Sequence, residues 1–102
     1  MIVVLFSATV REEARAEHDE TDDRLYGIVT SMPGFVSYKS YTSEDGEEIG
    51  LIRFENREAL EAWRTHPEHL AAQRRGREEF YASYDIEVLE QIRRSVFDRD
   101  AT

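Results

Sequence analysis

The residues best suited to chemistry lie in one short segment of the chain. Residues 63–77, WRTHPEHLAAQRRGR, contain the single tryptophan and two of the three histidines. An imidazole titrates near neutral pH, so His69 is a candidate acid or base that faces a ligand, and a helix-start histidine bonded to backbone is the alternative. His66 and His69 are three residues apart, which puts both imidazoles on one helix face and could suit a metal ion. No third ligand follows at a recognised spacing, so we predict a capping or solvent-exposed role for this pair and no metal site.

Two other features of the same segment have both a structural and a functional interpretation. Trp63 continues an apolar stripe, which is typical of a core anchor between helix and sheet. As a pocket wall, its flat face would instead stack on an aromatic substrate. Three arginines follow near the end of a helix (Arg74, Arg75 and Arg77). Salt bridges to neighbouring glutamates are the default expectation for them, and anion binding comes second.

A second group of candidates lies earlier in the chain, on a helix and on a strand. His18 and Thr21 are the polar members of an otherwise apolar helix face. If buried, they need hydrogen-bond partners, which a pocket between helix and sheet would supply; a position at the solvent boundary is the alternative. Tyr38 lies on one side of a predicted strand, with Phe35 and Tyr41 on the other. A phenol that lines a cavity could orient a substrate hydroxyl, although aromatic residues are also ordinary strand formers.

The composition limits the possible functions of the protein. The 102 residues include 22 acidic and 13 basic side chains, for a net charge of −9, and the length fits one domain (1–97) with a short tail (98–102). The acidic balance repels phosphate backbones, so we expect no nucleic-acid partner. The lack of cysteine excludes disulfides, thiolate nucleophiles, thiolate-bound zinc and iron–sulfur clusters. The apolar start has no basic leader or cleavage site and no run approaches the ~18–20 residues of a membrane span, so we expect a cytoplasmic protein without membrane contact.

Periodicity predicts the elements that position these side chains. An apolar strand spans residues 2–8, and Thr9 with Glu12 matches a capping box for the helix that follows. Apolar residues recur at helical spacing up to Met32, and the acidic residues between them, Asp22 included, read as a solvated face. The remaining strands are predicted at 35–42, 49–54 and about 84–92, with a hairpin turn at Asp45-Gly46.

The second helical region has its own start signals. Asn56 is expected to cap a helix that carries Trp63 on its buried side, and Pro67 is expected to open a fresh helical segment. The resulting order, β-α-β-β-α-β, predicts a ferredoxin-like α+β fold with both helices on one face of an antiparallel sheet.

The first predicted strand indicates what covers the other face of the sheet. One side of this strand carries Ile2, Val4, Phe6 and Ala8, and the other carries Val3 and Leu5. A strand with one side in water should alternate apolar and polar residues, whereas both sides are apolar here. A second copy of the chain is the natural cover, and two sheets packed face to face would bury ~800 Å² per protomer, so we predict a homodimer.

Three segments together resemble a known family. MPGFVSY (32–38) after an amphipathic helix, EALEAWR (58–64) and HPEHLAAQRRGR (66–77) resemble the antibiotic biosynthesis monooxygenase family in order and spacing. The resemblance implies a dimeric α/β barrel. It also implies oxidation of a phenolic or quinone-type aromatic by O₂ without metal or flavin, in a pocket that helps remove a proton from the substrate.

By this analogy the candidate residues receive roles. Trp63 would form the pocket wall, His69 or His18 would transfer the proton, and Tyr38 or Tyr41 would orient a hydroxyl. Thr21, His66 and Gln73 complete the set assigned to substrate binding.

The resemblance leaves two alternatives open. Heme-degrading relatives carry an iron-ligating histidine ten residues after the tryptophan; this chain has Gln73 there, which disfavours heme, although His69 could stand in. We therefore expect no cofactor. The other alternative is a non-catalytic dimer that binds a small aromatic metabolite or controls reactive quinones, since fold alone does not decide function.

Overall fold

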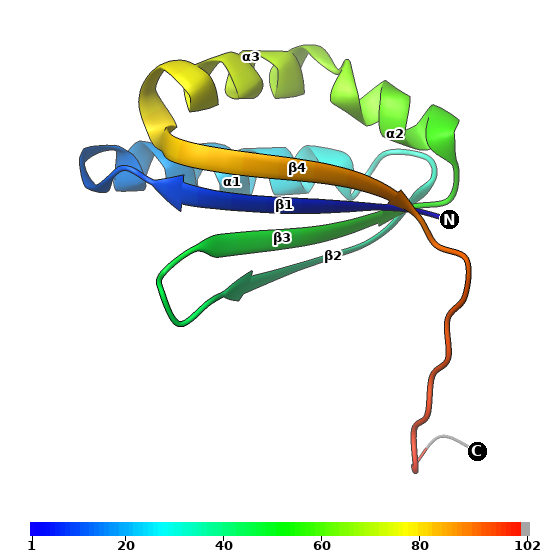
Figure 1. The fold of residues 1–102 in the computed structure, drawn as a ribbon. Helices are drawn as coiled ribbons and strands as arrows, with labels where there is room; N and C mark the ends of the chain where they lie inside the picture. Colours follow the sequence, from blue (N-terminus) through cyan, green and yellow to red (C-terminus); the bar gives the residue numbers. More distant parts are fainter. Residues whose placement is uncertain (101–102) are drawn as a thin grey trace.

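The computed structural model describes residues 1–100, in which one four-stranded sheet carries all the helices on a single face (Figure 1). The strands are β1 (Ile2–Val10), β2 (Phe35–Thr42), β3 (Glu48–Phe54) and β4 (Tyr81–Glu90), all antiparallel in the spatial order β2-β3-β1-β4. The helical elements are η1 (Glu12–Ala14), α1 (Arg15–Val29), α2 (Arg57–Arg64), α3 (Pro67–Arg75) and the π-helical turn η2 (Gly76–Phe80). The predicted ferredoxin-like α+β fold is therefore confirmed. None of these helices is long and apolar enough to cross a membrane.

The start of the first helix differs from the prediction. Thr9 belongs to β1, where it pairs with Ser83 of β4, so the predicted Thr9–Glu12 capping box does not form. Arg11 precedes the 3-10 turn with an extended backbone and no side-chain cap. Pairing with β4 thus extends β1 by two residues, so the helix begins later in the chain. Local sequence signals cannot predict this, because the pairing partner is distant in the sequence.

Strand β2 contains an irregularity that changes the face of one aromatic residue. Phe35 pairs with Phe54 and Ser37 pairs with Arg53, so Val36 is an extra residue between two consecutive pairs. Such a bulge reverses the alternation of side chains. Phe35 therefore points to the helices and packs on the Phe54 ring at 6.3 Å, on the same side as Tyr38; its predicted place on the opposite side is wrong.

The core between helices and sheet forms around Trp63. Its buried members are Val29 of α1, Phe54 of β3, and Ala59 and Trp63 of α2. Gly34, which follows α1, allows this close packing, because its φ is +86° and a Cβ there would lie 2.5 Å from the Cβ of Ala59. The indole of Trp63 is consequently fixed between helix and sheet, as a core anchor should be.

Both later helices begin at the predicted signals. The Asn56 side chain accepts a hydrogen bond from the Ala59 amide at 2.9 Å, which satisfies one free donor of α2. Pro67 occupies the first turn of α3, and the Nδ1 atom of His66 accepts from the Glu68 amide at 3.1 Å. The chain bends at the break between α2 and α3, and α3 continues over the same face of the sheet in the same general direction (Figure 1).

Replacing Asn56 by alanine is expected to lower the free energy of unfolding by about 1 kcal/mol, because the side-chain cap of α2 is lost. Urea denaturation followed by circular dichroism measures this difference. Asn56→Ser, which retains a side-chain acceptor, is expected to stay within a few tenths of a kcal/mol of the parent. Equal stability of the alanine variant and the parent would contradict the capping role.

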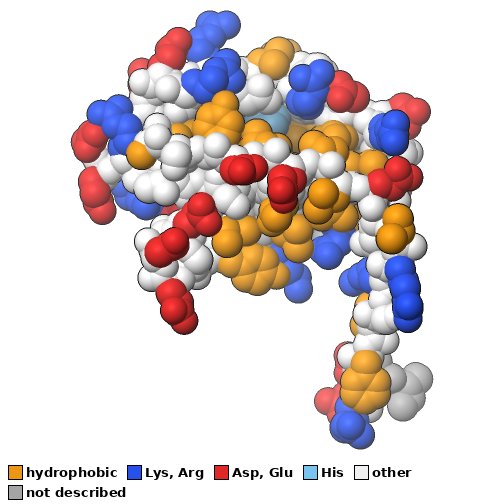
Figure 2. All heavy atoms as spheres, in the orientation of Figure 1, with side chains coloured by type: hydrophobic (Ala, Val, Ile, Leu, Met, Phe, Trp, Pro, Cys, Tyr) orange, Lys and Arg blue, Asp and Glu red, His pale blue; other side chains and the backbone are white. Residues whose placement is uncertain are grey.

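No helix of residues 1–100 covers the other face of the sheet, which carries an apolar patch on β1 and β3 among polar side chains (Figure 1). As predicted, Val3 and Leu5 lie on this side of β1, with Leu51 of β3 directly beside Leu5. Figure 2 shows hydrophobic side chains gathered on this side, below β4. Between residues 91 and 100 the chain has no helix or strand and runs away from the helices, and the predicted domain limit at residue 97 stays a prediction.

Candidate functional site

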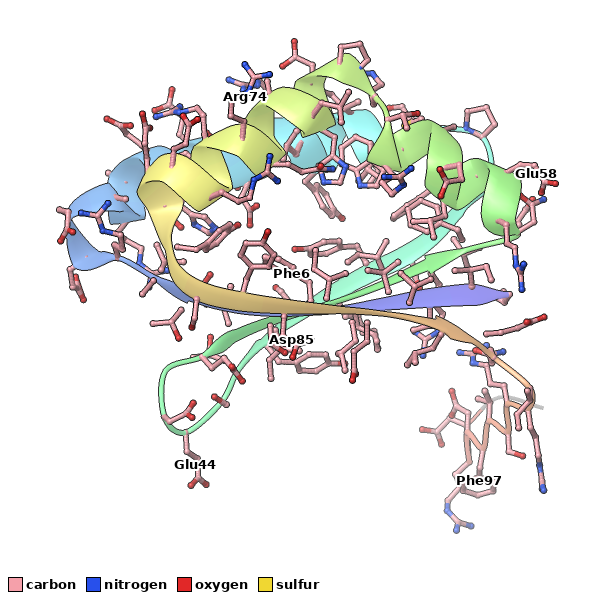
Figure 3. The ribbon with its side chains drawn as sticks, turned by 45° about the horizontal axis from the view of Figure 1, so that its top comes forward. Phe6, Glu44, Glu58, Arg74, Asp85 and Phe97 are labelled. Atoms are coloured by element: carbon pink, nitrogen blue, oxygen red, sulfur yellow. The ribbon has the colours of Figure 1, made fainter. Side chains whose placement is uncertain are left out.

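Aromatic and aliphatic side chains line the helix-facing side of the sheet. Phe6 of β1 points toward the helices (Figure 3), and its ring lies 5.5 Å from Tyr81 and 5.9 Å from Tyr84 of β4. Ile86 and Val88 follow Tyr84 on the same side of β4. The side chains of Tyr84, Ile86 and Val88 are 42–56% exposed although they face the helix layer. The helices therefore leave this part of β4 open to solvent. We call this surface, formed by Phe6, Tyr81, Tyr84, Ile86 and Val88, the aromatic recess.

Figure 2 shows hydrophobic side chains, with a histidine among them, between the helices and β4. Two shallow hollows lie elsewhere. One, of about 300 Å³, lies between α2 and the end of β4. The other, of about 380 Å³, lies between α1 and α3 and is lined mainly by charged side chains. Neither includes His69 or Trp63, so the chemistry of the side chains, rather than the size of a hollow, locates the candidate site.

Trp63 and His69 form a stacked pair on the helix side of the sheet. Their ring centroids are 4.1 Å apart and their planes differ by 14°. The Nδ1 atom of His69 lies 3.1 Å from the main-chain carbonyl oxygen of Trp63. A carbonyl oxygen can only accept, so Nδ1 carries the hydrogen and Nε2 keeps the free lone pair. The site therefore holds an imidazole in one defined tautomer beside a flat indole.

The protonation state of His69 suits a proton acceptor. Burial lowers the pKa of His69 below its usual value of 6.5, the hydrogen bond to the Trp63 carbonyl opposes this shift, and the neighbouring His66 adds to it. The ring is therefore neutral at neutral pH, with its lone pair available. A neutral imidazole of this kind can take a proton from an acidic O–H or C–H group.

Gln73 and His66 hold the helix junction together. The Gln73 side-chain amide donates to the main-chain carbonyl of Arg64 at 3.2 Å and lies 3.4 Å from Nδ1 of His69. Both of these nitrogens carry hydrogens, so the second contact is not a hydrogen bond. His66 caps α3, as the sequence favoured. Within residues 1–100 no group of three or more His, Asp or Glu side chains is placed to hold a metal ion.

His18 and Thr21 are both buried, at 4% and 6% exposure, so neither lies at the solvent boundary. The His18 ring packs edge-on against Phe80 and Tyr81, at 5.8 and 5.5 Å, and its Nδ1 atom lies 2.9 Å from the Asp19 carboxylate. His18 thus reaches the edge of the aromatic recess. Thr21 instead lines the charged hollow between α1 and α3, away from the Trp63–His69 pair.

Tyr38 and Tyr41 lie on opposite faces of β2. Tyr38 shares the helix-facing side, and burial, together with the nearby charge of Asp22, raises the pKa of Tyr38 to about 12. Tyr81 is shifted upward for the same two reasons, so its pKa also lies above the usual value of a phenol. Both phenols are consequently hydrogen-bond donors at neutral pH. Tyr41 is exposed on the open face and is not brought together with Trp63 and His69.

Arg75 of the basic cluster has a structural role. The guanidinium of Arg75 contacts the carboxylates of Glu79 and Glu17 and lies 4.7 Å above the Phe80 ring. These contacts confirm the predicted salt bridging for Arg75 and tie α3 to α1.

The sequence profile of the family described as antibiotic biosynthesis monooxygenase matches residues 1–75. The chain belongs to this family. The match confirms the resemblance inferred from the three segments between residues 32 and 77. The chain is also similar to the Bacillus subtilis protein YqjZ, with 32% identity over 97 residues, covering 95% of this chain and 84% of YqjZ.

Solved structures confirm the fold of this antibiotic biosynthesis monooxygenase family member. Rv0793 from Mycobacterium tuberculosis superposes with a TM-score of 0.82 at 24% identity, covering 93% of this chain and 98% of Rv0793. SnoaB from Streptomyces nogalater, described as a cofactor-independent oxygenase, gives a TM-score of 0.77 at 16% identity, covering 95% of this chain and 97% of SnoaB.

Gln73 disfavours the heme alternative in this family member. Gln73, at the position of the expected iron ligand, donates its amide to the Arg64 carbonyl. The substitute imidazole, His69, stacks on Trp63 and uses Nδ1 for a main-chain hydrogen bond. Gln73 therefore offers no imidazole at this position, whereas His69 keeps a free lone pair on Nε2.

Proposed function

We propose that this protein is a monooxygenase that needs no cofactor and uses O₂ to oxidise a small electron-rich aromatic compound, such as an anthrone or a hydroquinone-type phenol. The observation that carries the proposal is the stacked Trp63–His69 pair, in which a single tautomer of a neutral imidazole stands beside a flat aromatic wall. Family membership and the description of SnoaB as a cofactor-independent oxygenase support it.

The reaction of an anthrone-type substrate balances without an external reductant. The Nε2 atom of His69 removes a proton from the activated CH₂ group, and the carbanion transfers its electrons to O₂ as the new C–O bond forms. Loss of the second hydrogen and cleavage of the O–O bond give the ketone and one water, so R₂CH₂ and O₂ yield R₂C=O and H₂O. The protonated His69 returns its proton to the departing oxygen.

The remaining side chains orient the substrate and stabilise its anion. The substrate ring is expected to lie against the exposed side chains of the aromatic recess, because Trp63 is only 8% exposed and His69 stacks on its indole. Tyr38 and Tyr81, whose phenols stay protonated at neutral pH, donate hydrogen bonds to substrate oxygens on which negative charge develops.

An oxygen electrode with a panel of anthrones and hydroquinones tests the proposal. We expect consumption of one O₂ per ketone formed, unchanged by catalase because no hydrogen peroxide is released. Thermal stabilisation by the same compounds without oxygen uptake would instead support the non-catalytic binding protein. No uptake with any member of the panel would refute the proposed activity.

The pH dependence of kcat/KM is expected to show an acidic limb with a pKa below 6.5. His69 acts as the base only when neutral, and burial lowers the pKa of His69, so activity rises with pH through that lowered value and then stays level. Initial rates between pH 4 and 8, with a substrate that does not titrate in this range, measure the limb. His66→Ala should keep the limb but move it toward higher pH, because His66 contributes to the lowered pKa of His69, and a rate that increases toward acid pH would contradict the assignment.

A further inference from the structure

The charged hollow between α1 and α3 lies between two ion pairs that join these helices. At one end, Arg75 of α3 contacts the carboxylate of Glu17 of α1. At the other end, Arg24 of α1 lies near the carboxylate of Glu68 of α3. On each helix the two members are seven residues apart, which is about 10 Å along the axis. Their order is opposite on the two helices, so α1 and α3 run antiparallel and the ion pairs bound the hollow at both ends.

Short side chains on α3 explain why the space between the ion pairs is open. The residues within one turn of both Glu68 and Arg75 are Ala71 and Ala72, whose methyl groups do not fill the gap between two helices. The hollow has a volume of about 380 Å³. It therefore has room for a small polar molecule, on the side of the helix layer away from the Trp63–His69 pair.

Thr21 brings an unused hydroxyl group to this hollow. It lines the hollow from α1, three residues before Arg24 and four after Glu17, and is only 6% exposed. Within residues 1–100 its hydroxyl makes no hydrogen bond. In the same part of the chain, the Nε atom of Arg53 is the one buried side-chain atom that is fully enclosed without a partner, so the Thr21 oxygen is open to the hollow. A buried hydroxyl of this kind needs a partner from outside the protein.

Glu20 and Arg24 line the same hollow and also have unused hydrogen-bonding capacity. They are four residues apart on α1, a spacing at which acidic and basic side chains often pair, yet they form no ion pair with each other. The Nε atom of Arg24 lies 3.6 Å from Glu68, too far for a hydrogen bond. Within the described residues the Glu20 carboxylate has no ion pair or side-chain hydrogen bond. The fold therefore leaves a guanidinium, a carboxylate and a hydroxyl free around one hollow.

The charges around the hollow select the kind of ligand. Two carboxylates and two guanidinium groups line it, so the site has no net charge (Glu17, Glu20, Arg24 and Arg75). A simple anion would meet both carboxylates, and a simple cation would meet both guanidinium groups. A zwitterion satisfies both signs. In an α-amino acid the carboxylate and the ammonium group share one carbon, which suits an Arg24 and a Glu20 that lie one helical turn apart.

We infer that the hollow between α1 and α3 is a binding site for a free α-amino acid. The ligand carboxylate accepts hydrogen bonds from the Arg24 guanidinium, and the ligand ammonium donates to the Glu20 carboxylate and to the Thr21 hydroxyl. Thr21 then contacts a ligand of its own, separate from any substrate at the Trp63–His69 pair. The site does not depend on the proposed oxygenase activity.

Titration of the ¹⁵N-labelled protein with L-alanine, up to about 20 mM, tests the site by NMR. We expect amide shifts to change around residues 17–24 and 68–75, with a dissociation constant on the order of 1 mM because exposed charge pairs are weak. N-acetyl-L-alanine lacks the ammonium group and L-alaninamide lacks the carboxylate. Each is expected to bind at least about tenfold more weakly than L-alanine, since one charge-assisted contact is lost.

Two exposed substitutions assign these contacts to their residues. Glu20→Gln is expected to abolish the preference for L-alanine over N-acetyl-L-alanine, and Arg24→Gln to abolish the preference over L-alaninamide. Asp23→Asn is the matched control, because it removes one negative charge from α1 outside the hollow, and it should keep both preferences. The site would be refuted by no shift changes with L-alanine, by equal binding of the three compounds, or by preferences that survive in Glu20→Gln and Arg24→Gln.

Discussion

Replacing His69 by alanine is expected to lower the rate of oxygen uptake at saturating substrate by about 10²–10⁴-fold, the usual contribution of a general base. The imidazole is the one group beside Trp63 that is neutral, fixed in its tautomer and able to accept a proton. Because substrate binding is proposed to depend mainly on the aromatic recess, we expect KM to change only a few-fold. Stopped-flow or oxygen-electrode measurements at several substrate concentrations separate the two parameters.

Two further measurements distinguish proton transfer from a structural effect. His66→Ala removes the cap of α3, so it should cost about 1 kcal/mol of unfolding free energy while the turnover rate stays near that of the parent. Added imidazole should restore part of the rate of His69→Ala, because it can enter the space of the missing side chain and accept the proton. A His69→Ala variant with the parent rate would refute the base.

Local signals in the sequence were sufficient for most of the fold. The period-2 pattern of the strands and the turn at Asp45-Gly46 concern neighbouring residues, and the helix starts at Asn56 and Pro67 depend on side chains within three positions. Such signals act in the same way in any fold. The pairing of Trp63 with His69 was also accessible, since both residues lie in one short segment.

The errors arose where distant parts of the chain decide the outcome. Thr9 is a good helix cap by type, yet pairing with β4 holds it in a strand. Phe35 changed sides because Val36 bulges out of the ladder with β3. Asp22 is exposed, as its acidic neighbours indicated, but only the positions of Tyr38 and Tyr81 on two other strands show that its charge lies near these phenols. No pattern along α1 carries that information.

The uncovered face of the sheet leads to a prediction about assembly. Leu51 of β3 lies at its centre, between Leu5 of β1 and Lys39 of β2. On the same face, the Nε atom of Arg53 is buried without a hydrogen-bond partner. The segment that follows β4 runs out on this side and exposes Ile92, Val96 and Phe97 (Figure 1). We propose that a second copy of the chain covers these groups.

Leu51→Lys is expected to convert the dimer into a monomer. The dissociation constant of the dimer should rise by about 100-fold or more. A two-fold interface would bring the new ammonium group of each copy into the apolar contact, where an unpaired charge costs several kcal/mol, and each ~1.4 kcal/mol is a factor of ten. Sedimentation equilibrium at micromolar concentration measures the mass against the 11.9 kDa of one chain.

Glu44→Gln is the matched control for this substitution. It shifts the net charge by the same amount but lies in the β2–β3 loop, where the side chain points away from the body of the protein (Figure 3). This variant should sediment as the dimer, since only the position of the charge differs from Leu51→Lys. A parent protein that sediments with the mass of one chain would contradict the dimer, because the apolar face of β1 and β3 would then be stable in water without a cover.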